Sequence, residues 1–468
     1  VIGSGPAGMA AAHDLACLGY QVTVFEALPV IGGMFHIGIP SYRLPRDIIK
    51  MDVEAIRKLG VEIQTHTRVG KDIIIPKLKE YGFEAVVVAV GAQISRGLPI
   101  DGVELEGVLN GISFLKDIYI GEDNAKLGDK ILVIGGGNVA IDVARTAVRM
   151  GPKEVHMVCL ESREEMPADE LEIEEAKEEG VILHPGLGPR KIVGSNGKAE
   201  GLECIKVASV FDSEGRFNPT FVEGTEAIIE ADTIIITIGQ ASDTSWADKV
   251  DDLQFSRWGT IVVDKDTFAT NIPGIFAAGD VATGPGIAIG AVDSGKRAAQ
   301  SVDEYLSGKK TTTSHKAKMT VIKSHKMIDG YEKIGIRDVP VISPEKRVKD
   351  FEGIEIGYSE EMAIEQGKRC LRCNINTIFD SDKCILCGGC VDVCPEYCYK
   401  MVKVEDIAGN ESLGKLVEAR YGASLEEGVA MIKDEDRCIR CGLCARRCPV
   451  KAITMELFEY EEVVSRNE

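Results

Sequence analysis

The sequence predicts an α/β protein built on parallel sheets, followed by a small α+β domain. Over roughly the first 300 of the 468 residues, short apolar runs alternate with helical stretches, as in parallel-sheet proteins. Two segments, 1–26 and 131–161, repeat one order of strand, glycine-rich turn, helix and strand. Near the C-terminus, eight of the 14 cysteines form two copies of one spacing. The prediction is therefore two Rossmann-like dinucleotide-binding domains and a small cysteine-rich domain.

The first glycine turn has the features of a dinucleotide site. Gly3, Gly5 and Gly8 follow a strand and open a helix, and Glu26 ends the next strand. Such glycines allow a tight turn, close approach to a pyrophosphate and close packing of helix on strand. The helix N-terminus offers free N–H groups to phosphates, and the terminal acid can accept hydrogen bonds from a ribose.

The second glycine turn repeats the pattern with one accepted variation. Gly135 and Gly137 are followed by Ala140 in the third place, and Glu161 ends the following strand. Two such units in one chain imply two dinucleotides.

Composition excludes several classes of function. The net charge of −20 disfavours binding to nucleic acid and to anionic membranes. We find no apolar run near the ~18 residues that cross a bilayer, and no secretory signal. Clustered cysteines indicate a reducing compartment, so we expect a cytoplasmic protein without membrane insertion. Only Val1 and Ile2 precede the first glycine, and a strand needs ~5 residues, so we expect the natural chain to continue upstream.

The cysteine repeats have the spacing of bacterial two-cluster ferredoxins. Each repeat reads C-x2-C-x2-C-x3-C-P, in which three cysteines bind one [4Fe–4S] cluster and the fourth crosses to the other. Zinc is the weaker alternative for such thiolates. One cluster is expected to use Cys384, Cys387, Cys390 and Cys448, and the other Cys438, Cys441, Cys444 and Cys394.

Three further segments carry weaker expectations. Cys370 and Cys373 form a natural half metal site that Cys398, or cysteines of an upstream segment, could complete to bind zinc or a third cluster; the alternative is two free thiols in a turn. The insert 395–437 is expected to form a short helical decoration near Ser412–Lys433, either a docking surface or inert. The charge run Glu164–Glu179 is interpreted as the solvated face of a helix.

A third motif distinguishes the two dinucleotide sites. Residues 269–280 end in Gly279-Asp280 and precede a glycine-rich helix start at 284–290, which resembles the second FAD fingerprint of flavoprotein reductases with two dinucleotide domains. The resemblance implies that Asp280 binds the ribityl chain and that the outer unit holds FAD. The implied FAD contacts are Gly3, Gly5, Pro6, Ala7, Gly8, Glu26, Gly33, Met34, Arg43, Leu44, Gly91, Gly279, Asp280, Gly286, Ile287 and Ala288. The implied NAD(P) contacts are Gly135, Gly137, Asn138, Val139, Ala140, Glu161, Ser162, Arg163 and Gly239.

Further motifs narrow the resemblance. Gly32-Gly33-Met34, the run 38–45 and Met166-Pro167 resemble the small subunit of bacterial glutamate synthase. They equally resemble the large subunit of NADH-dependent ferredoxin:NADP oxidoreductase. The Gly-Gly turn lacks the cysteine pair of disulfide reductases, which disfavours thiol–disulfide chemistry.

The choice of nicotinamide coenzyme rests on two residues. A carboxylate at Glu161 suits a free ribose 2′-hydroxyl, so we favour NAD(H). Arg163 could reach a 2′-phosphate, so NADP(H) stays possible.

The expected organisation follows from these motifs. It comprises an FAD domain at 1–105 and 232–308, an inserted NAD(P) domain at 106–231, a linker at 309–365 and a two-[4Fe–4S] ferredoxin-like domain at 366–468. We expect an NAD(P)H-dependent oxidoreductase that passes electrons between nicotinamide, FAD and clusters, to a ferredoxin or to other redox subunits. The resemblance also admits an electron-bifurcating complex. The alternatives are the electron-donating subunit of a glutamate synthase-type system and a non-catalytic electron-wiring adaptor.

Overall fold

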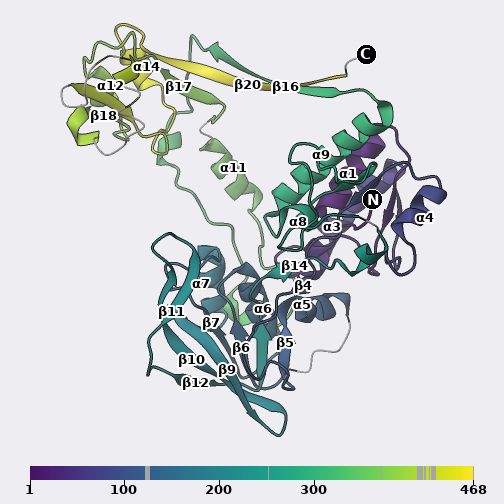
Figure 1. Ribbon diagram of the computed structural model, residues 1–468. Coiled ribbons are helices and arrows are strands. Elements are labelled where there is room, and N and C mark those ends of the chain that lie inside the picture. Colours follow the sequence, from purple (N-terminus) through teal and green to yellow (C-terminus); the bar gives the residue numbers. More distant parts are fainter. Residues whose placement is uncertain are drawn as a thin grey trace. The chain divides into compact units, whose positions relative to one another are not determined.

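The computed structural model describes residues 1–121, 127–250, 252–369, 372–407 and 428–466, with 415, 418–420 and 422. The chain forms two compact units (Figure 1). Unit 1 comprises Val1–Lys310 with Val341–Ile356, and unit 2 comprises Thr311–Pro340 with Gly357–Asn467. Within the described ranges, no helix has the length and apolar character needed to cross a membrane. The predicted fold class is confirmed.

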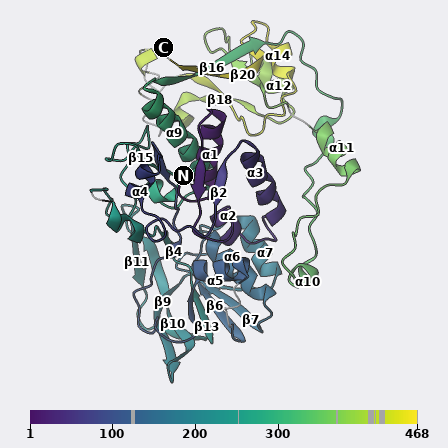
Figure 2. The same ribbon diagram turned by 90° about the vertical axis from the view of Figure 1, so that its right-hand side faces the viewer.

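The first sheet of unit 1 carries the first glycine turn. Its parallel strands are β1 (Thr23–Phe25), β2 (Glu62–Gln64), β3 (Val86–Val88) and β15 (Ile275–Ala277). Ile2 bridges β1 and β3, which gives the order β2-β1-Ile2-β3-β15. Helices α1 (Pro6–Cys17) and α9 (Ala288–Ser307) lie side by side (Figure 2) and share a buried core with this sheet. Gly295 permits their close approach, because a Cβ there would lie 2.1 Å from the Ala7 carbonyl oxygen.

The second sheet of unit 1 carries the second glycine turn. Five parallel strands run in the order β5-β13-β6-β7-β8. They span Val108–Asn110 (β5), Thr233–Ile236 (β13), Lys130–Ile134 (β6), Glu154–Val158 (β7) and Ile182–His184 (β8). The helices that follow in this half are α5 (Gly111–Ile120), α6 (Asn138–Arg149) and α7 (Glu170–Glu178). Strand β13 was expected in the FAD domain, but its pairing with β5 and β6 places it here, since its apolar run suits any buried parallel strand.

An antiparallel sheet that no sequence motif predicts covers the second sheet. It consists of β9 (Leu187–Ser195), β10 (Lys198–Phe211), β11 (Phe217–Phe221) and β12 (Ala227–Glu230). Strand β10 pairs with each of the other three. Leu202 and Cys204 on β10 pack in one core with Leu132 on β6.

Shorter elements complete unit 1. They are α2 (Met34–Ile37), α3 (Arg46–Lys58), α4 (Ile75–Glu80), α8 (Asp280–Thr283), α10 (Pro344–Arg347), β4 (Ile94–Ser95) and β14 (Gln240–Ala241). Residues 341–356, named the strap here, run over unit 1. Ile354 N–H donates to the Tyr42 carbonyl (3.1 Å), and Ser41 Oγ donates to the Phe351 carbonyl (2.9 Å). The strap therefore differs from the linker expected at 309–365.

Unit 2 is an α+β unit around the cysteine repeats. Strands β16 (Thr311–Val321), β20 (Ile453–Arg466) and β17 (Ile375–Phe379) form an antiparallel sheet, and β18 (Tyr399–Lys403) pairs with β19 (Val429–Lys433). Its helices include α11 (Glu360–Lys368), α12 (Gly389–Val393) and α14 (Leu443–Arg447).

Two expectations differ from the structure of unit 2. The run Gly308–Lys318, read as linker, supplies most of β16, because its threonines favour strands although it lacks an apolar period. The expected helical decoration near Ser412–Lys433 is wrong at its end, where β19 is a strand. Part of the insert, including 408–414 and 423–427, lies outside the described residues.

Candidate functional site

A cavity of about 360 Å³ in unit 1 lies where the first sheet ends and where α1 and α9 begin. The carboxyl ends of parallel strands and helix N-termini are the usual place for a dinucleotide. Most of the expected FAD contacts line this cavity: Gly3, Gly5, Pro6, Ala7, Glu26, Gly33, Met34, Arg43, Gly91, Gly279, Asp280, Gly286, Ile287 and Ala288.

Two expected contacts, Gly8 and Leu44, do not line the cavity. A Cβ on Gly8 would lie 2.0 Å from the Gly3 carbonyl oxygen, so this glycine serves the packing of α1 on the turn. Leu44 packs against a small core that includes Ile49 on α3. Both residues support the cavity from behind it.

The backbone around the first glycine turn leaves room for a bulky ligand group. Gly33 has φ +55°, and a Cβ there would lie 2.7 Å from the Cα of Gly5. Gly3 has φ +101°, and its Cβ would lie 2.4 Å from the Ala89 carbonyl oxygen. Side chains at these positions would fill or distort the turn, so the glycines fit the pyrophosphate of a dinucleotide.

Two carboxylates flank the cavity. Glu26 follows β1 and accepts hydrogen bonds from the N–H groups of Ser4 (2.9 Å) and Leu28 (2.8 Å). Asp280 opens α8, and burial raises the pKa of its carboxyl, against a hydrogen bond from the Gly286 N–H. The first lies beside the glycine turn and the second beside the start of α9, where a ribose and a ribityl chain would lie in the expected arrangement.

Trp246 is a cavity residue that the sequence motifs did not identify. It is buried and lines the cavity, and its Nε1 has no hydrogen-bond partner among the described residues. A buried indole N–H normally finds an acceptor. The orphaned donor therefore fits a ligand with acceptor atoms, such as FAD, and lies outside any glycine motif that could have revealed it.

The second glycine turn adjoins the same cavity. Helix α6 begins at Asn138, with Gly137 as its N-cap, and Asn138 and Val139 line the cavity. Gly135 has φ +148°, and a Cβ there would lie 2.4 Å from Thr237 Oγ1. Ala140 is fully buried beneath the turn, and Gly239 lies outside the cavity lining.

The residues expected to select the coenzyme lie after β7. A Cβ on Gly136 would lie 2.8 Å from Glu161 Oε2, so this carboxylate sits over the glycine turn. Arg163 is held by Glu170 (2.6 Å) and Glu174 (2.8 Å) on α7. Neighbouring Ser162 uses its N–H to bind Glu165 (3.3 Å). The charge of Arg163 is therefore already compensated by two carboxylates.

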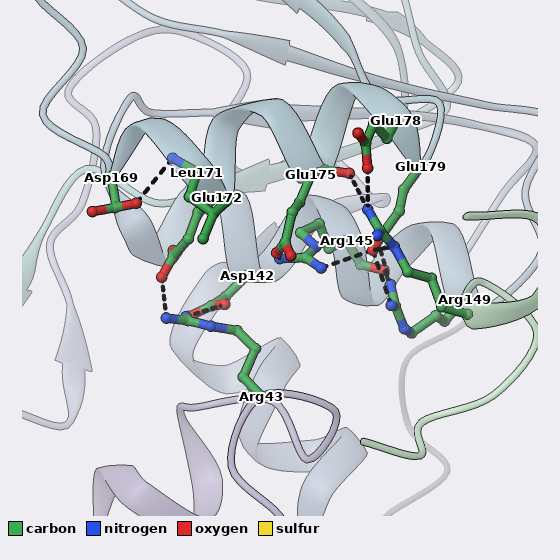
Figure 3. Close-up of polar contacts among 11 residues, drawn as sticks. Arg43, Asp142, Arg145, Arg149, Asp169, Leu171, Glu172, Glu175, Glu178 and Glu179 are labelled. Carbon is green, nitrogen blue, oxygen red and sulfur yellow. Dashed lines mark hydrogen bonds and ion pairs between the residues drawn. The ribbon is translucent and has the colours of Figure 1, made fainter. Parts of the chain in front are cut away.

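An ion pair inside the cavity joins the loop between α2 and α3 to helix α6. Arg43 Nη1 donates to both carboxylate oxygens of Asp142, at 2.7 and 2.8 Å, and Nη2 bonds Glu172 on α7 (Figure 3). Burial raises the pKa of Asp142 to about 7, although Arg43 opposes this shift. The pair connects segments 99 residues apart, and both of its residues line the cavity.

The expected solvated helix face at 164–179 is wrong for its C-terminal half. Glu179 has no exposed side-chain surface and binds Arg145 (2.7 Å), Arg149 (2.6 Å) and Arg347 of the strap (2.8 Å), as Figure 3 shows in part. Burial opposes its charge, but hydrogen bonds from Arg149 and Arg145 hold the pKa of Glu179 below its usual range. Arg149 also stacks 3.7 Å from the centre of the Tyr42 ring.

The cysteine repeats of unit 2 enclose two small cavities. One is lined by Cys384, Cys387, Cys390 and Cys448, and the other by Cys438, Cys441, Cys444 and Cys394. These are the two ligand sets that the spacing predicts. No three His, Cys, Asp or Glu side chains in the described part of the chain are grouped to hold a single metal ion. Each cavity brings together the four thiols that one [4Fe–4S] cluster needs.

The possible extra metal site at Cys370 and Cys373 stays a prediction. Cys370 lies outside the described residues, and Cys373 is exposed. Cys398 instead lines the second cluster cavity.

Comparison with known proteins identifies two families along the chain. Residues 1–295 match the pyridine nucleotide-disulphide oxidoreductase family, and residues 383–455 match a 4Fe-4S dicluster domain. These matches indicate FAD and NAD(P)H binding in unit 1 and two [4Fe–4S] clusters in unit 2.

Several curated proteins are similar over most of the chain. The NADP(+)-dependent formate dehydrogenase subunit beta of Moorella thermoacetica is 40% identical over 383 residues, which cover 80% of this chain and 54% of that protein. The NADPH-Fe(3+) oxidoreductase subunit beta of Geobacter sulfurreducens is 35% identical, over 80% of this chain and 61% of its own length. The glutamate synthase [NADPH] small chain of Escherichia coli is 31% identical, over 65% and 68%. The chain thus spans little more than half of the first two relatives.

Among solved structures, the Mycobacterium tuberculosis oxidoreductase FprA has the same fold. It superposes with a TM-score of 0.56 at 20% identity, over 66% of this chain and 84% of that one.

Proposed function

We propose that this chain, which belongs to the pyridine nucleotide-disulphide oxidoreductase family, is a flavin-dependent NAD(P)H oxidoreductase subunit that exchanges electrons with two [4Fe–4S] clusters. The observation that carries the proposal is the co-occurrence in one chain of a cavity bordered by two glycine turns and of two four-cysteine cavities. When bound, FAD accepts a hydride from a reduced nicotinamide and releases electrons singly, which links a two-electron carrier to one-electron clusters.

The residues of unit 1 bind and orient the two dinucleotides in this proposal. The N-terminus of α1 receives the FAD pyrophosphate, and the N-terminus of α9 presents its partial positive charge to the flavin. Trp246 donates its free indole N–H to an FAD acceptor atom. The N-terminus of α6 receives the second pyrophosphate, and the Arg43–Asp142 pair borders the space between the two ligands.

Despite the family name, a disulfide plays no part in the proposed reaction. The Gly32-Gly33 turn is followed by Met34, and no cysteine is present among the residues that line the cavity. The electrons therefore leave the flavin for the clusters and not for a thiol pair.

We further propose that the coenzyme is NAD(H). Glu161 lies over the glycine turn, where a carboxylate accepts hydrogen bonds from a ribose diol and repels a 2′-phosphate. Arg163 is held by two glutamates of α7. The names of the relatives favour NADP(H) instead, so a direct comparison of the two coenzymes decides the question.

The proposal includes partner subunits in a reducing compartment such as the cytoplasm. The relatives are named as subunits or small chains, and electrons that reach the clusters need an acceptor, either a ferredoxin or another redox subunit. Supply of electrons to a glutamate synthase-type partner is the second candidate. The glutamate synthase small chain aligns with 65% of this chain, whereas the two beta subunits align with 80%, which favours the first.

Anaerobic reduction by NADH and NADPH tests the function. We expect NADH to bleach the flavin absorbance of the intact chain and then to reduce the clusters, with kcat/KM at least about tenfold higher than for NADPH. Glu161→Ala should reduce this ratio, and Glu164→Ala, an exposed glutamate of the same loop, should not. Reduction by NADPH alone would contradict the coenzyme assignment. A flavin that neither coenzyme bleaches would favour the non-catalytic adaptor.

A further inference from the structure

The two cluster cavities of unit 2 are built on one repeated backbone. The N–H of Cys398 donates to Cys394 Sγ (3.2 Å), and the N–H of Ala452, at the equivalent place in the second repeat, donates to Cys448 Sγ (3.1 Å). The φ angles also repeat in three equivalent pairs: Leu386 (52°) with Arg440 (57°), Gly388 (74°) with Gly442 (73°), and Tyr397 (51°) with Lys451 (54°). Differences between the clusters must therefore come from the side chains that surround them.

The first cavity, formed by Cys384, Cys387, Cys390 and Cys448, is otherwise apolar. Every described side chain that lines it, apart from the four thiols, is a hydrocarbon or a thioether: Phe379, Ile385, Met431, Val450, Ala452 and Ile453. None of these side chains can donate a hydrogen bond to a cluster sulfur.

The second cavity, formed by Cys438, Cys441, Cys444 and Cys394, contains additional polar groups. Cys398 and Tyr399 occupy the places taken by Ala452 and Ile453 in the first cavity, and both are at most 3% exposed. The Tyr399 hydroxyl lies beside Cys444 but has no hydrogen bond of ordinary geometry to any described residue. A buried hydroxyl without a partner is costly, so its position beside Cys444 fits a donor to the sulfurs of a bound cluster.

Thr377 provides a second oriented hydroxyl. Lys433 Nζ donates to Thr377 Oγ1 at 2.8 Å, which leaves the hydroxyl hydrogen free to point toward Cys438 Sγ at 3.6 Å. The Lys433 side chain is only 10% exposed, so its positive charge is poorly screened by water. Arg440, which also lines this cavity, is 15% exposed, and both cations pair with Glu435 (2.6 and 3.1 Å), so one positive charge in excess remains beside the cavity.

We propose that Thr377, Cys398 and Tyr399 give the cluster held by Cys438, Cys441, Cys444 and Cys394 the higher reduction potential of the two. One-electron reduction adds one negative charge to a cluster, and no proton is required. Hydrogen bonds to the sulfurs and nearby positive charge stabilise the reduced state and raise the potential. An electron shared by the pair therefore resides mainly on the second cluster. The inference rests on the dicluster domain and does not depend on the proposed nicotinamide substrate.

A mediated anaerobic titration of the full chain with dithionite, followed by EPR, tests this inference. Dithionite reduces the clusters directly, so failure of the NAD(P)H proposal would not affect the result. We expect two separate one-electron transitions in the wild-type protein. Tyr399→Phe should lower the higher potential by an amount equal to about a tenfold change in the reduced-to-oxidised ratio, which is ~59 mV for one electron. The lower potential should stay in place.

Tyr397→Phe is the matched control, because it removes the same hydroxyl from a side chain that is 67% exposed and lies two residues before Tyr399. It should change neither potential. A single shared potential in the wild type would overturn the proposal, as would a Tyr399→Phe protein with eight irons and unchanged potentials.

A reciprocal pair of variants tests the asymmetry without removing the tyrosine. Cys398→Ala reproduces the residue of the first cavity and should lower the higher potential. Ala452→Cys introduces the thiol into the first cavity and should raise the lower potential. Shifts of the opposite sign, or a shift of the first cluster's potential in Cys398→Ala, would overturn the assignment.

Discussion

Arg347 anchors the strap through a buried charge cluster, and its replacement should release the strap. The side chain is 2% exposed. Its Nε donates to Glu179 (2.8 Å), and its Nη2 donates to Glu178 (3.0 Å) and to the Glu175 carbonyl (3.2 Å). Arg347→Met removes these three hydrogen bonds and keeps most of the apolar volume.

The expected loss of stability depends on the hydrogen-bond partners that Glu179 keeps in the Arg347→Met variant. Breaking an isolated buried ion pair costs about 3–5 kcal/mol, because one charge is left without a partner. Here Arg145 and Arg149 still bind Glu179, so we expect a smaller loss of ~2–3 kcal/mol in the free energy of unfolding. For a unit of this size that loss lowers the melting temperature by roughly 3–5 °C.

Two measurements check the expectation. Thermal unfolding followed by flavin fluorescence gives the change in melting temperature, and limited trypsin digestion at exposed Lys346 and Lys349 reports release of the strap. Arg337→Met is the matched control: Arg337 pairs with Glu365 at 2.9 Å but is 52% exposed, so its loss should cost less than ~1 kcal/mol. Equal melting temperatures and equal digestion rates for the two variants would refute the role of the buried cluster.

Two further predictions concern the cavity of unit 1. Burial raises the pKa of Asp142 to about 7, so the folded state binds more protons than the unfolded state between about pH 4 and 7, and stability falls as pH rises through this window. Asp142→Asn should remove this pH dependence, which amounts to at most ~4 kcal/mol in the free energy of unfolding across the window. Parallel pH profiles of the free energy of unfolding for the two proteins would contradict this prediction. Trp246→Phe should weaken FAD binding by about tenfold, because one hydrogen bond contributes ~1–1.5 kcal/mol. Equal FAD dissociation constants, measured by fluorescence, would show that the indole N–H does not bind the cofactor.

The parts of the site that the sequence predicts are those with a strict local requirement. Gly3 and Gly33 have positive φ angles and no room for a side chain, and such positions leave a recognisable glycine pattern. The cluster cysteines also meet a strict local requirement, because three ligands from one short segment must reach one cluster, and their spacing is therefore fixed. Trp246 acts through one donor atom on a segment without a motif, so no pattern points to it.

The fold, like the site, has parts that leave a local sequence pattern and parts that do not. The alternation of strands and helices predicts both parallel sheets, because their central strands β3, β15, β6 and β13 are buried and read as apolar runs. Strand β16 escapes prediction because its sequence lacks an apolar period, and its register comes from pairing with β20, far away in the sequence. The strap has no periodicity of its own and is ordered by contacts such as that of Arg347.

The buried charge cluster shows what could have been inferred from helical spacing alone. Arg145 and Arg149 are four residues apart on α6, within a run of buried apolar residues, and a buried arginine requires an acceptor. Glu175 and Glu179 are also four residues apart, so they share one helix face. These two matched pairs argue against a fully solvated α7. The fifth member, Arg347, comes from a strap 168 residues beyond Glu179, and only the tertiary structure reveals that three arginines share this one buried carboxylate. Because each arginine alone would leave Glu179 partly unsatisfied, the strap is part of the charge balance of unit 1 and not a passive connection.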